Sequence, residues 1–212
     1  MAFIIVGLGN PGEEYVGTRH NTGREALFDF AKVNDFSEWT TDLKSKSLIS
    51  SGKIGREAVT LVSPETFMNK SGDAVKKIEQ KLKVKSKKAK EKDKKNIEIE
   101  NLVVVHDDLD IPFGKFKISF NKSAGGHRGV ESIVKVLKTE GFTRVRVGIS
   151  PANSKGVAKK PVGEEAVNKF ILGKFKLAEV EDLKKLSKII STALTAIVTE
   201  GHEKAMSQQG SF

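Results

Sequence analysis

The chain has 212 residues with 37 Lys and Arg against 27 Asp and Glu, so its formal net charge is +10. A chain of this length can bury a sizeable core and is expected to form one domain. Its lack of Cys excludes disulfides and thiolate sites and suits an intracellular protein. No run of about 18 apolar residues could span a membrane, and the opening lacks the basic leader of a signal peptide.

The lysine-rich run at residues 83–95 holds much of the positive charge. Its eight lysines against Glu91 and Asp93 give +6, so the rest of the chain carries +4. Such a run is typical of a solvated, self-repelling loop or helix extension. Nonspecific attraction to RNA is the alternative. We interpret the run as part of an insertion at about residues 83–98, between a helix and a strand.

The chain opens on a short apolar segment, residues 3–6, which predicts a buried first strand. A turn at Asn10-Pro11-Gly12 follows, and apolar residues at helical spacing predict a helix from Thr22 onwards. Residues 7–12 also fit the dinucleotide-binding pattern G-x-G-x-x-G. In that fold the third glycine opens the helix, whereas here about ten residues follow Gly12 before a helix is predicted. The dinucleotide interpretation is therefore disfavoured.

The remaining elements alternate between strands and helices, which indicates an α/β domain. A hairpin-like pair is predicted over residues 39–62, and Ser63-Pro64 is expected to start a short helical piece. The further strands and helices are expected at residues 71–82 (helix), 101–105 (strand), 115–119 (strand), 127–138 (helix), 143–149 (strand) and 177–200 (a long terminal helix).

Two predicted strands end near Asn10 and Asp107, and ligands of open α/β sheets bind outside the carboxyl ends of strands. His20 follows the first of these strands. A carboxylate that holds one nitrogen of a histidine fixes its tautomer and leaves the other nitrogen to deprotonate water. His20 and Asp107 are candidates for such a general base, and a surface or capping histidine is the alternative interpretation.

Asn10 and Asn69 are candidates for binding a substrate through its main chain. A substrate whose last residue varies must be held in this way, and a carboxamide can both donate and accept. Turn formation and a helix end are the alternative roles of these two asparagines.

Asp107, Asp108 and Asp110 could form a magnesium site, but one acidic cluster without a phosphate-cradling loop is weak support for it. His127, at a predicted helix start, has neighbouring amides that could meet phosphate.

Five segments carry a resemblance to a known family, and they occur in order: G-L-G-N-P-G at residues 7–12, T-R-H-N at 18–21, F-M-N-K-S-G at 67–72, H-D-D-L-D at 106–110 and G-G-H-R-G at 125–129. Together they resemble the bacterial-type peptidyl-tRNA hydrolase family over nearly the whole chain. The resemblance implies an esterase that releases tRNA from a prematurely released peptide by hydrolysing the ester to its 3′-terminal ribose. It implies no metal and no cofactor. With the α/β pattern, we expect a single-domain, three-layer α/β/α fold over residues 1–212, with a mixed, mostly parallel twisted sheet flanked by helices.

The resemblance also implies roles for individual residues. The catalytic His of the family falls on His20 and its Asp partner on Asp107. The matching positions that hold the peptide backbone and the terminal adenosine, or line the cleft, are Asn10, Tyr15, Phe67, Met68 and Asn69. Many bacterial members have an asparagine at the position of Arg128, so that role is not carried over. Arg128 stays a substrate-site candidate that contacts a phosphate or faces solvent.

For tRNA, Lys117 and Arg146 match positions whose cations are thought to clamp the terminal phosphate of the acceptor end. Lys115 and Arg144 flank them. Two facing pairs on successive strands would form a positive stripe, and a solvated strand edge is the alternative. Contacts directed at the nucleic-acid backbone suit an enzyme that accepts most tRNAs.

The expected partner is peptidyl-tRNA, contacted at its acceptor stem, its 3′ end and the main chain of its peptide. We expect a monomer in the cytoplasm with no membrane contact, although an organellar location in a eukaryote stays open. Plant organellar relatives suggest a different class of function, because they keep this fold and serve as partners of RNA-binding proteins in intron splicing. The intact Asn10, His20, Asn69 and Asp107 favour the enzyme over a catalytically silent RNA-processing partner.

Overall fold

The computed structural model describes residues 2–81, 87–88 and 97–212. Most of the lysine-rich run, and with it most of the insertion expected at residues 83–98, lies outside the described residues. Among the described helices, none has a stretch both long and apolar enough to cross a bilayer.

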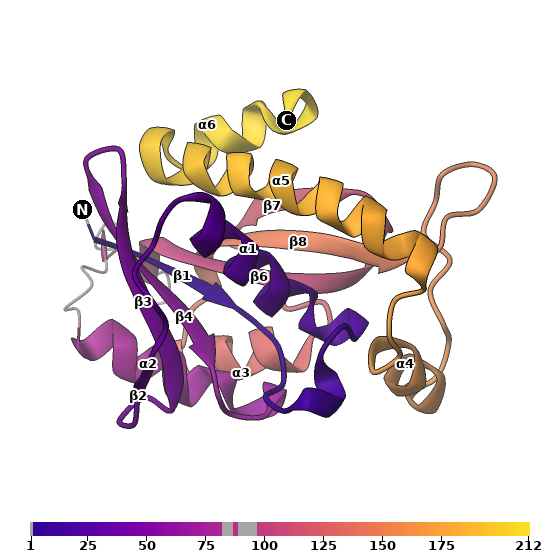
Figure 1. Ribbon diagram of the computed structural model, residues 1–212, viewed down its shortest axis with the longest axis horizontal. Helices are drawn as coiled ribbons and strands as arrows, with labels where there is room; N and C mark the ends of the chain where they lie inside the picture. The colour runs from indigo at the N-terminus through magenta and orange to yellow at the C-terminus, as the bar shows by residue number, and fades with distance from the viewer. Residues whose placement is uncertain (1, 82–86, 89–96) are drawn as a thin grey trace.

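One mixed sheet runs through the molecule (Figure 1), and its strands lie side by side in the following order: β2 (Thr40–Asp42), β3 (Ser47–Ile54), β4 (Glu57–Pro64), β1 (Ala2–Gly7), β6 (Ile97–Pro112), β8 (Gly141–Ser150) and β7 (Phe116–Phe120). The short β5 (Lys87–Lys88) pairs with β6. The four neighbours β4, β1, β6 and β8 are parallel, whereas β2, β3 and β7 join antiparallel. The carboxyl ends of the parallel strands therefore meet at one edge of the sheet.

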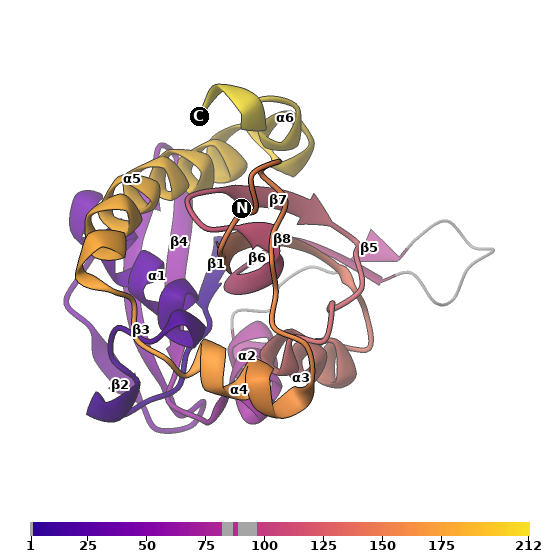
Figure 2. The same cartoon turned by 90° about the vertical axis from the view of Figure 1, so that its right-hand side faces the viewer.

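Helices cover both faces of this sheet, as Figures 1 and 2 show. The helices α1 (Thr22–Val33) and α5 (Leu177–Glu200) pack on one face, against Ile5 of β1 and its neighbours. On the other face, α2 (Ser71–Lys81) and α3 (Arg128–Leu137) pack against Ile4. Successive strand residues point to opposite faces, so an unbroken apolar strand supplies both cores. The predicted three-layer α/β/α fold is confirmed.

Two glycines let α1 approach the sheet very closely. A Cβ on Gly23, in the first turn of α1, would collide with the carbonyl oxygen of Val105 on β6, and a Cβ on Gly7 would collide with the carbonyl oxygen of Gly23. Only glycine permits main chain to pack on main chain at this distance. The start of α1 is thereby held against the carboxyl end of β1 and the middle of β6, and the residues just before α1 lie beside the second half of β6.

The segment before α1 forms two short 3-10 helices, η1 (Glu13–Tyr15) and η2 (Arg19–Asn21). Gly12 precedes η1, and α1 begins only at Thr22. No α-helix start therefore lies where a dinucleotide pyrophosphate would need one. This geometry agrees with the rejection of the dinucleotide interpretation on sequence spacing.

One local expectation was wrong, and one helix was missed. Residues Ser63 and Pro64 continue β4, because they pair with Leu48 and Ser47 of β3, and the helical piece is the 3-10 helix η3 (Met68–Lys70). Pro64 is tolerated at the end of the strand, where its missing N–H interrupts no further pairing. The helix α4 (Glu164–Ile171) was not predicted. The chain ends with α6 (His202–Ser207) and the 3-10 helix η4 (Gln209–Ser211) beside α5 and β7.

Candidate active site

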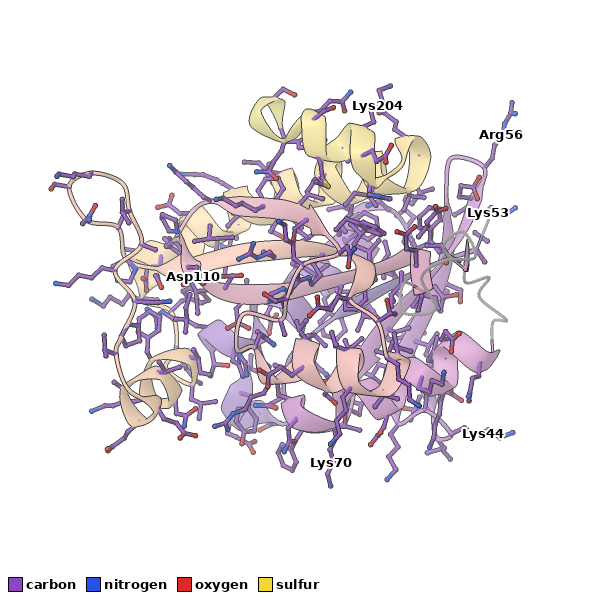
Figure 3. The ribbon with its side chains drawn as sticks, turned by 180° about the vertical axis from the view of Figure 1, so that it is seen from behind. Lys44, Lys53, Arg56, Lys70, Asp110 and Lys204 are labelled. Atoms are coloured by element: carbon purple, nitrogen blue, oxygen red, sulfur yellow. The ribbon has the colours of Figure 1, made fainter. Side chains whose placement is uncertain are left out.

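A cleft of about 760 Å³ opens at the carboxyl edge of the sheet. Its walls are the second half of β6, η3, the start of α3 and the segment through α4. Asp110, labelled in Figure 3, lies at this edge. The cleft is lined by every residue that the sequence singled out for catalysis or peptide binding: Asn10, Tyr15, His20, Phe67, Met68 and Asn69, together with Asp107 and Arg128.

His20 is held in place by the two residues beside it. Arg19 is buried and donates to the carbonyl oxygen of Lys174 (2.8 Å) and to Glu179 (2.9 Å). Its guanidinium also lies over the rings of Phe170 and Phe175. Asn21 accepts from the Asn10 amide (2.8 Å) and donates to the Asn10 carbonyl oxygen (3.0 Å). The sequence showed Arg19 and Asn21 next to His20 but indicated no role for them.

The centre of the cleft is a carboxylate shared by two imidazoles. His20 Nδ1 lies 3.0 Å from Asp107 Oδ1 and 3.1 Å from Oδ2. His127 Nε2 lies 2.9 Å from the same Oδ1. The His20 and His127 side chains are each 8% exposed and that of Asp107 is 3% exposed, so all three lie at the closed end of the cleft.

His127 is the N-cap of α3, and this fixes its tautomer. Its Nδ1 accepts from the amides of Gly129 (3.1 Å) and Val130 (3.3 Å). A nitrogen that accepts must carry a lone pair, so the proton of the neutral ring is on Nε2 and is donated to Asp107. The His127 side chain therefore occupies two of the helix amides that the sequence suggested could meet a phosphate.

The charges in this cluster stabilise one another. Burial alone would raise the pKa of Asp107, but the two imidazoles hold it well below its usual range. Burial alone would lower the pKa of His20, but the Asp107 carboxylate outweighs this and the opposing charge of Arg128, so that the pKa lies above 6.5. Asp107 is therefore ionised near neutral pH and orients His20 with Nδ1–H towards itself.

His106, which the sequence suggested has no catalytic role, is fully buried beneath this cluster. Its Nδ1 donates to the main-chain oxygen of Asp107 (2.7 Å), and its ring packs edge-on against His127 with the centroids 4.7 Å apart. Burial and the neighbouring His127 hold the pKa of His106 well below 6.5, so the ring is neutral. His106 supports the main chain of Asp107 and does not line the cleft.

Asn10 presents only one of its two polar groups to the cleft. Its Oδ1 accepts from the Met68 amide (2.8 Å), which leaves the Nδ2 hydrogens free among the described residues. Asn69 is exposed on the cleft wall and has no side-chain hydrogen bond in the described part of the chain. Asn10 is therefore oriented as a donor, whereas Asn69 can donate and accept.

The acidic cluster does not gather for a magnesium ion. Asp108 pairs with Arg146 (2.7 Å) and Asp110 with Lys160 (2.5 Å), while Asp107 faces the imidazoles. Across residues 2–81, 87–88 and 97–212, the group of side chains that could hold a metal ion is His20, Asp107 and His127. Two nitrogens and one oxygen suit a transition metal better than magnesium.

The positive stripe expected to contact tRNA is present only in part. Lys117 and Arg146 are direct cross-strand neighbours on β7 and β8, and Lys117 and Lys115 are exposed. Arg144 is only 1% exposed and donates to the Ser123 carbonyl oxygen (2.9 Å), so its expected place in a surface stripe was wrong. Burial and the nearby Arg146 lower the pKa of Arg144 to about 10. Its charge is retained but lies beneath the loop that leads to α3.

Arg128 lines the cleft with a largely exposed side chain. Its guanidinium pairs with Glu164 at the start of α4 (2.5 Å), with side-chain exposures of 55% and 77%. This exposed pair joins two walls of the cleft.

The α4 wall of the cleft also supplies Val167, Asn168 and Ile171, which sequence reasoning missed. The apolar positions of this eight-residue helix were the only signal for it, and they are too few to separate a helix from a loop.

Comparisons with known proteins agree with this geometry. Residues 4–211 match the model of the family described as peptidyl-tRNA hydrolase. The peptidyl-tRNA hydrolase of Carboxydothermus hydrogenoformans is 39% identical, over 96% of both chains, and that of Alkaliphilus oremlandii is 38% identical, over 97% of both. A crystal structure of peptidyl-tRNA hydrolase from Acinetobacter baumannii superposes with a TM-score of 0.83 at 27% identity, covering 100% of this chain and 95% of that one. The chain therefore belongs to the peptidyl-tRNA hydrolase family.

Proposed function

We propose that this protein hydrolyses the ester between a peptide and the 3′-terminal ribose of tRNA, and so recycles tRNA from prematurely released peptidyl-tRNA. The observation that carries the proposal is the contact of His20 Nδ1 with the Asp107 carboxylate at 3.0 Å, at the end of the cleft. Family membership supplies the substrate class. None of the comparisons supports the alternative of a catalytically silent RNA-processing partner.

In the proposed mechanism, His20 acts as a general base through Nε2. Because Nδ1–H is donated to Asp107, the lone pair of the neutral ring is on Nε2, which has no partner in the described part of the chain. Nε2 takes a proton from a water whose oxygen attacks the ester carbonyl carbon. The same proton then passes to the departing ribose oxygen, which leaves as the free tRNA 3′ hydroxyl. The other product is the peptide carboxylic acid, which releases its remaining proton to solvent and becomes the carboxylate. The Asp107 carboxylate stabilises the imidazolium that forms between the two steps.

We propose that Asn10 Nδ2 donates to the ester carbonyl oxygen, where negative charge develops. Asn69 would hold the peptide main chain or the terminal adenosine, with Tyr15, Phe67 and Met68 as the walls of the cleft.

We also propose that the chain acts as a single domain and a monomer in the cytoplasm, where translation supplies its substrate. A turnover assay with an N-blocked aminoacyl-tRNA tests the function: we expect release of free tRNA at the same rate with and without EDTA. Absence of turnover by the folded protein would refute the proposal.

The fixed orientation of Asn10 allows a sharp test with Asn10→Asp. The aspartate can still accept from the Met68 amide but has no hydrogens to donate to the substrate. Loss of this hydrogen bond is expected to cost about 1–3 kcal/mol of transition-state stabilisation, measured as kcat/KM. The effect should be similar for substrates with different C-terminal residues, because the contact is with the main chain. Unchanged kcat/KM in Asn10→Asp would show that Asn10 acts only by holding Met68.

A salt titration tests the proposed phosphate contacts of Lys117 and Arg146. Removing either side chain should weaken substrate binding and flatten the plot of log affinity against log salt by roughly 0.7 to 0.9 per contact. Lys53→Ala is the matched control, because Lys53 points outward on the far side of the molecule from Asp110 (Figure 3). Deleting residues 83–95 should also leave the slope nearly unchanged. A slope that falls only in the deletion variant would place the tRNA-binding surface in the lysine-rich run.

A further inference from the structure

Three potential metal ligands meet at the closed end of the cleft. His20 Nδ1, Asp107 Oδ1 and His127 Nε2 all lie within 4.8 Å of one another. Each nitrogen is about one hydrogen-bond length from the shared oxygen, at 3.0 and 2.9 Å. The ligand atoms of a tetrahedral zinc ion, bound at about 2.1 Å, lie about 3.4 Å apart. Side-chain adjustments can therefore bring these atoms to zinc distances without rearranging the main chain.

We propose that His20, Asp107 and His127 form an inhibitory site for a divalent transition metal ion, and that Zn²⁺ fits it best. Two imidazole nitrogens and one carboxylate oxygen are a common zinc ligand set, and the fourth position would face the cleft that all three side chains line. Asp107 accepts from two imidazoles and is already a carboxylate, so it can bind the ion directly. A hard ion such as Mg²⁺ prefers oxygen ligands and should not compete.

The position of the protons on the two rings explains why the ion would inhibit. A metal ion on His20 Nδ1 needs the lone pair of that nitrogen, so the ring proton moves to Nε2. The ring stays neutral, but Nε2 then has no lone pair for a water proton. Binding of the ion does not depend on the proposed function, whereas inhibition rests on it, because only a general base at Nε2 is lost in this way.

The same shift at His127 gives the site an independent signature. When Nε2 binds the ion, the proton of His127 moves to Nδ1, which can then no longer accept from the amides of Gly129 and Val130. Metal binding should therefore release the N-cap of α3. The two capping contacts are long, at 3.1 and 3.3 Å, so they oppose binding only weakly.

The binding test uses the substrate-free protein. Titration with CoCl₂ should give the intense visible absorption of four-coordinate Co²⁺, and ZnSO₄ should displace it while MgCl₂ does not. Amide NMR resonances of Gly129 and Val130 should shift when Zn²⁺ saturates the site. His127→Asn should lower the Zn²⁺ affinity by at least about 10-fold, and the matched control His202→Asn, on α6 outside the cleft, should leave it unchanged. Equal affinity in wild type and His127→Asn, or unshifted amides at saturation, would overturn the site.

The inhibition test uses turnover of an N-blocked aminoacyl-tRNA. ZnSO₄ should inhibit the wild type, EDTA should restore its rate, and the inhibition constant of each variant should follow its directly measured Zn²⁺ affinity. Each rate is compared with the metal-free rate of the same variant. Zn²⁺ binding at the three side chains with unchanged turnover would overturn the inhibitory mechanism. If the protein hydrolyses no substrate, the proposed function fails, while the absorption and NMR measurements still decide the metal site.

Discussion

Replacing His20 with Ala is expected to lower kcat by roughly 10²–10⁴-fold, the usual contribution of a positioned general base. The substitution removes the group that takes the proton of the attacking water, but it leaves Asn10, Asn69 and the basic side chains in place. Binding of uncharged tRNA should therefore change little. Single-turnover rates with an N-blocked aminoacyl-tRNA, alongside a tRNA-binding titration, separate the two effects.

Two controls accompany this variant. His20 is only 6% exposed, so thermal unfolding must show that His20→Ala is folded at the assay temperature. His202→Asn removes a histidine on α6, outside the cleft, and should keep wild-type turnover. If His20→Ala retained the wild-type kcat, the general base would have to be another group, because no second imidazole of the described cleft has a free nitrogen: both nitrogens of His127 are engaged.

Asp107→Asn is expected to lower turnover less than His20→Ala and to change its pH dependence. In the wild type, the base form of His20 predominates only above its pKa, which lies above 6.5 because of the Asp107 carboxylate. The rate should therefore rise as the pH rises through that value. Without the carboxylate, burial and the charge of Arg128 remain, and both lower the pKa of His20. The midpoint of the profile should move to lower pH, measured as kcat/KM in buffers containing EDTA.

The direction of this shift distinguishes electrostatics from simple loss of geometry. An asparagine keeps the size of the side chain and can accept one hydrogen bond through its oxygen, but it can also favour the wrong imidazole tautomer. A wrong tautomer lowers the maximal rate without lowering the midpoint. Lys53→Ala, which removes a distant surface charge, is the matched control and should leave the midpoint unchanged. A midpoint that stays above 6.5 in Asp107→Asn would mean that another group sets the pKa of His20.

The shared carboxylate of Asp107 links the orientation of His20 to the position of α3. One oxygen accepts from both His20 and His127, and His127 is in turn fixed by the first amides of α3. The orientation of the proposed base therefore depends on a helix more than 100 residues further along the chain. We expect the position of α3 to matter for turnover even though no residue of α3 needs to touch the reacting bond.

The sequence by itself determined the fold class and the residues around which the cleft is built. The unbroken apolar strands predicted a sheet covered on both faces, because a strand buried on both sides needs no polar alternation. His20, Asn10 and Asp107 were singled out by their places near the ends of predicted strands, Asn69 by the chemistry of its carboxamide, and all four by the resemblance of short motifs. These signals are local, so they can be read from one stretch of chain at a time.

Only the tertiary structure decided how these residues meet. The pairing of Asp107 with His20 depends on the close packing of α1 on β6 at Gly23, and its pairing with His127 depends on the position of α3 on the other face of the sheet. Arg144 and Arg146 lie on the same face of β8, but the loop through Ser123 covers Arg144, whose guanidinium donates to the Ser123 carbonyl oxygen. The Arg128 contact with Glu164 joins the first residues of α3 and α4, which are 36 residues apart in the chain. Each of these contacts joins segments that are far apart in the sequence. Such contacts are determined by the packing of the whole core and not by local propensity.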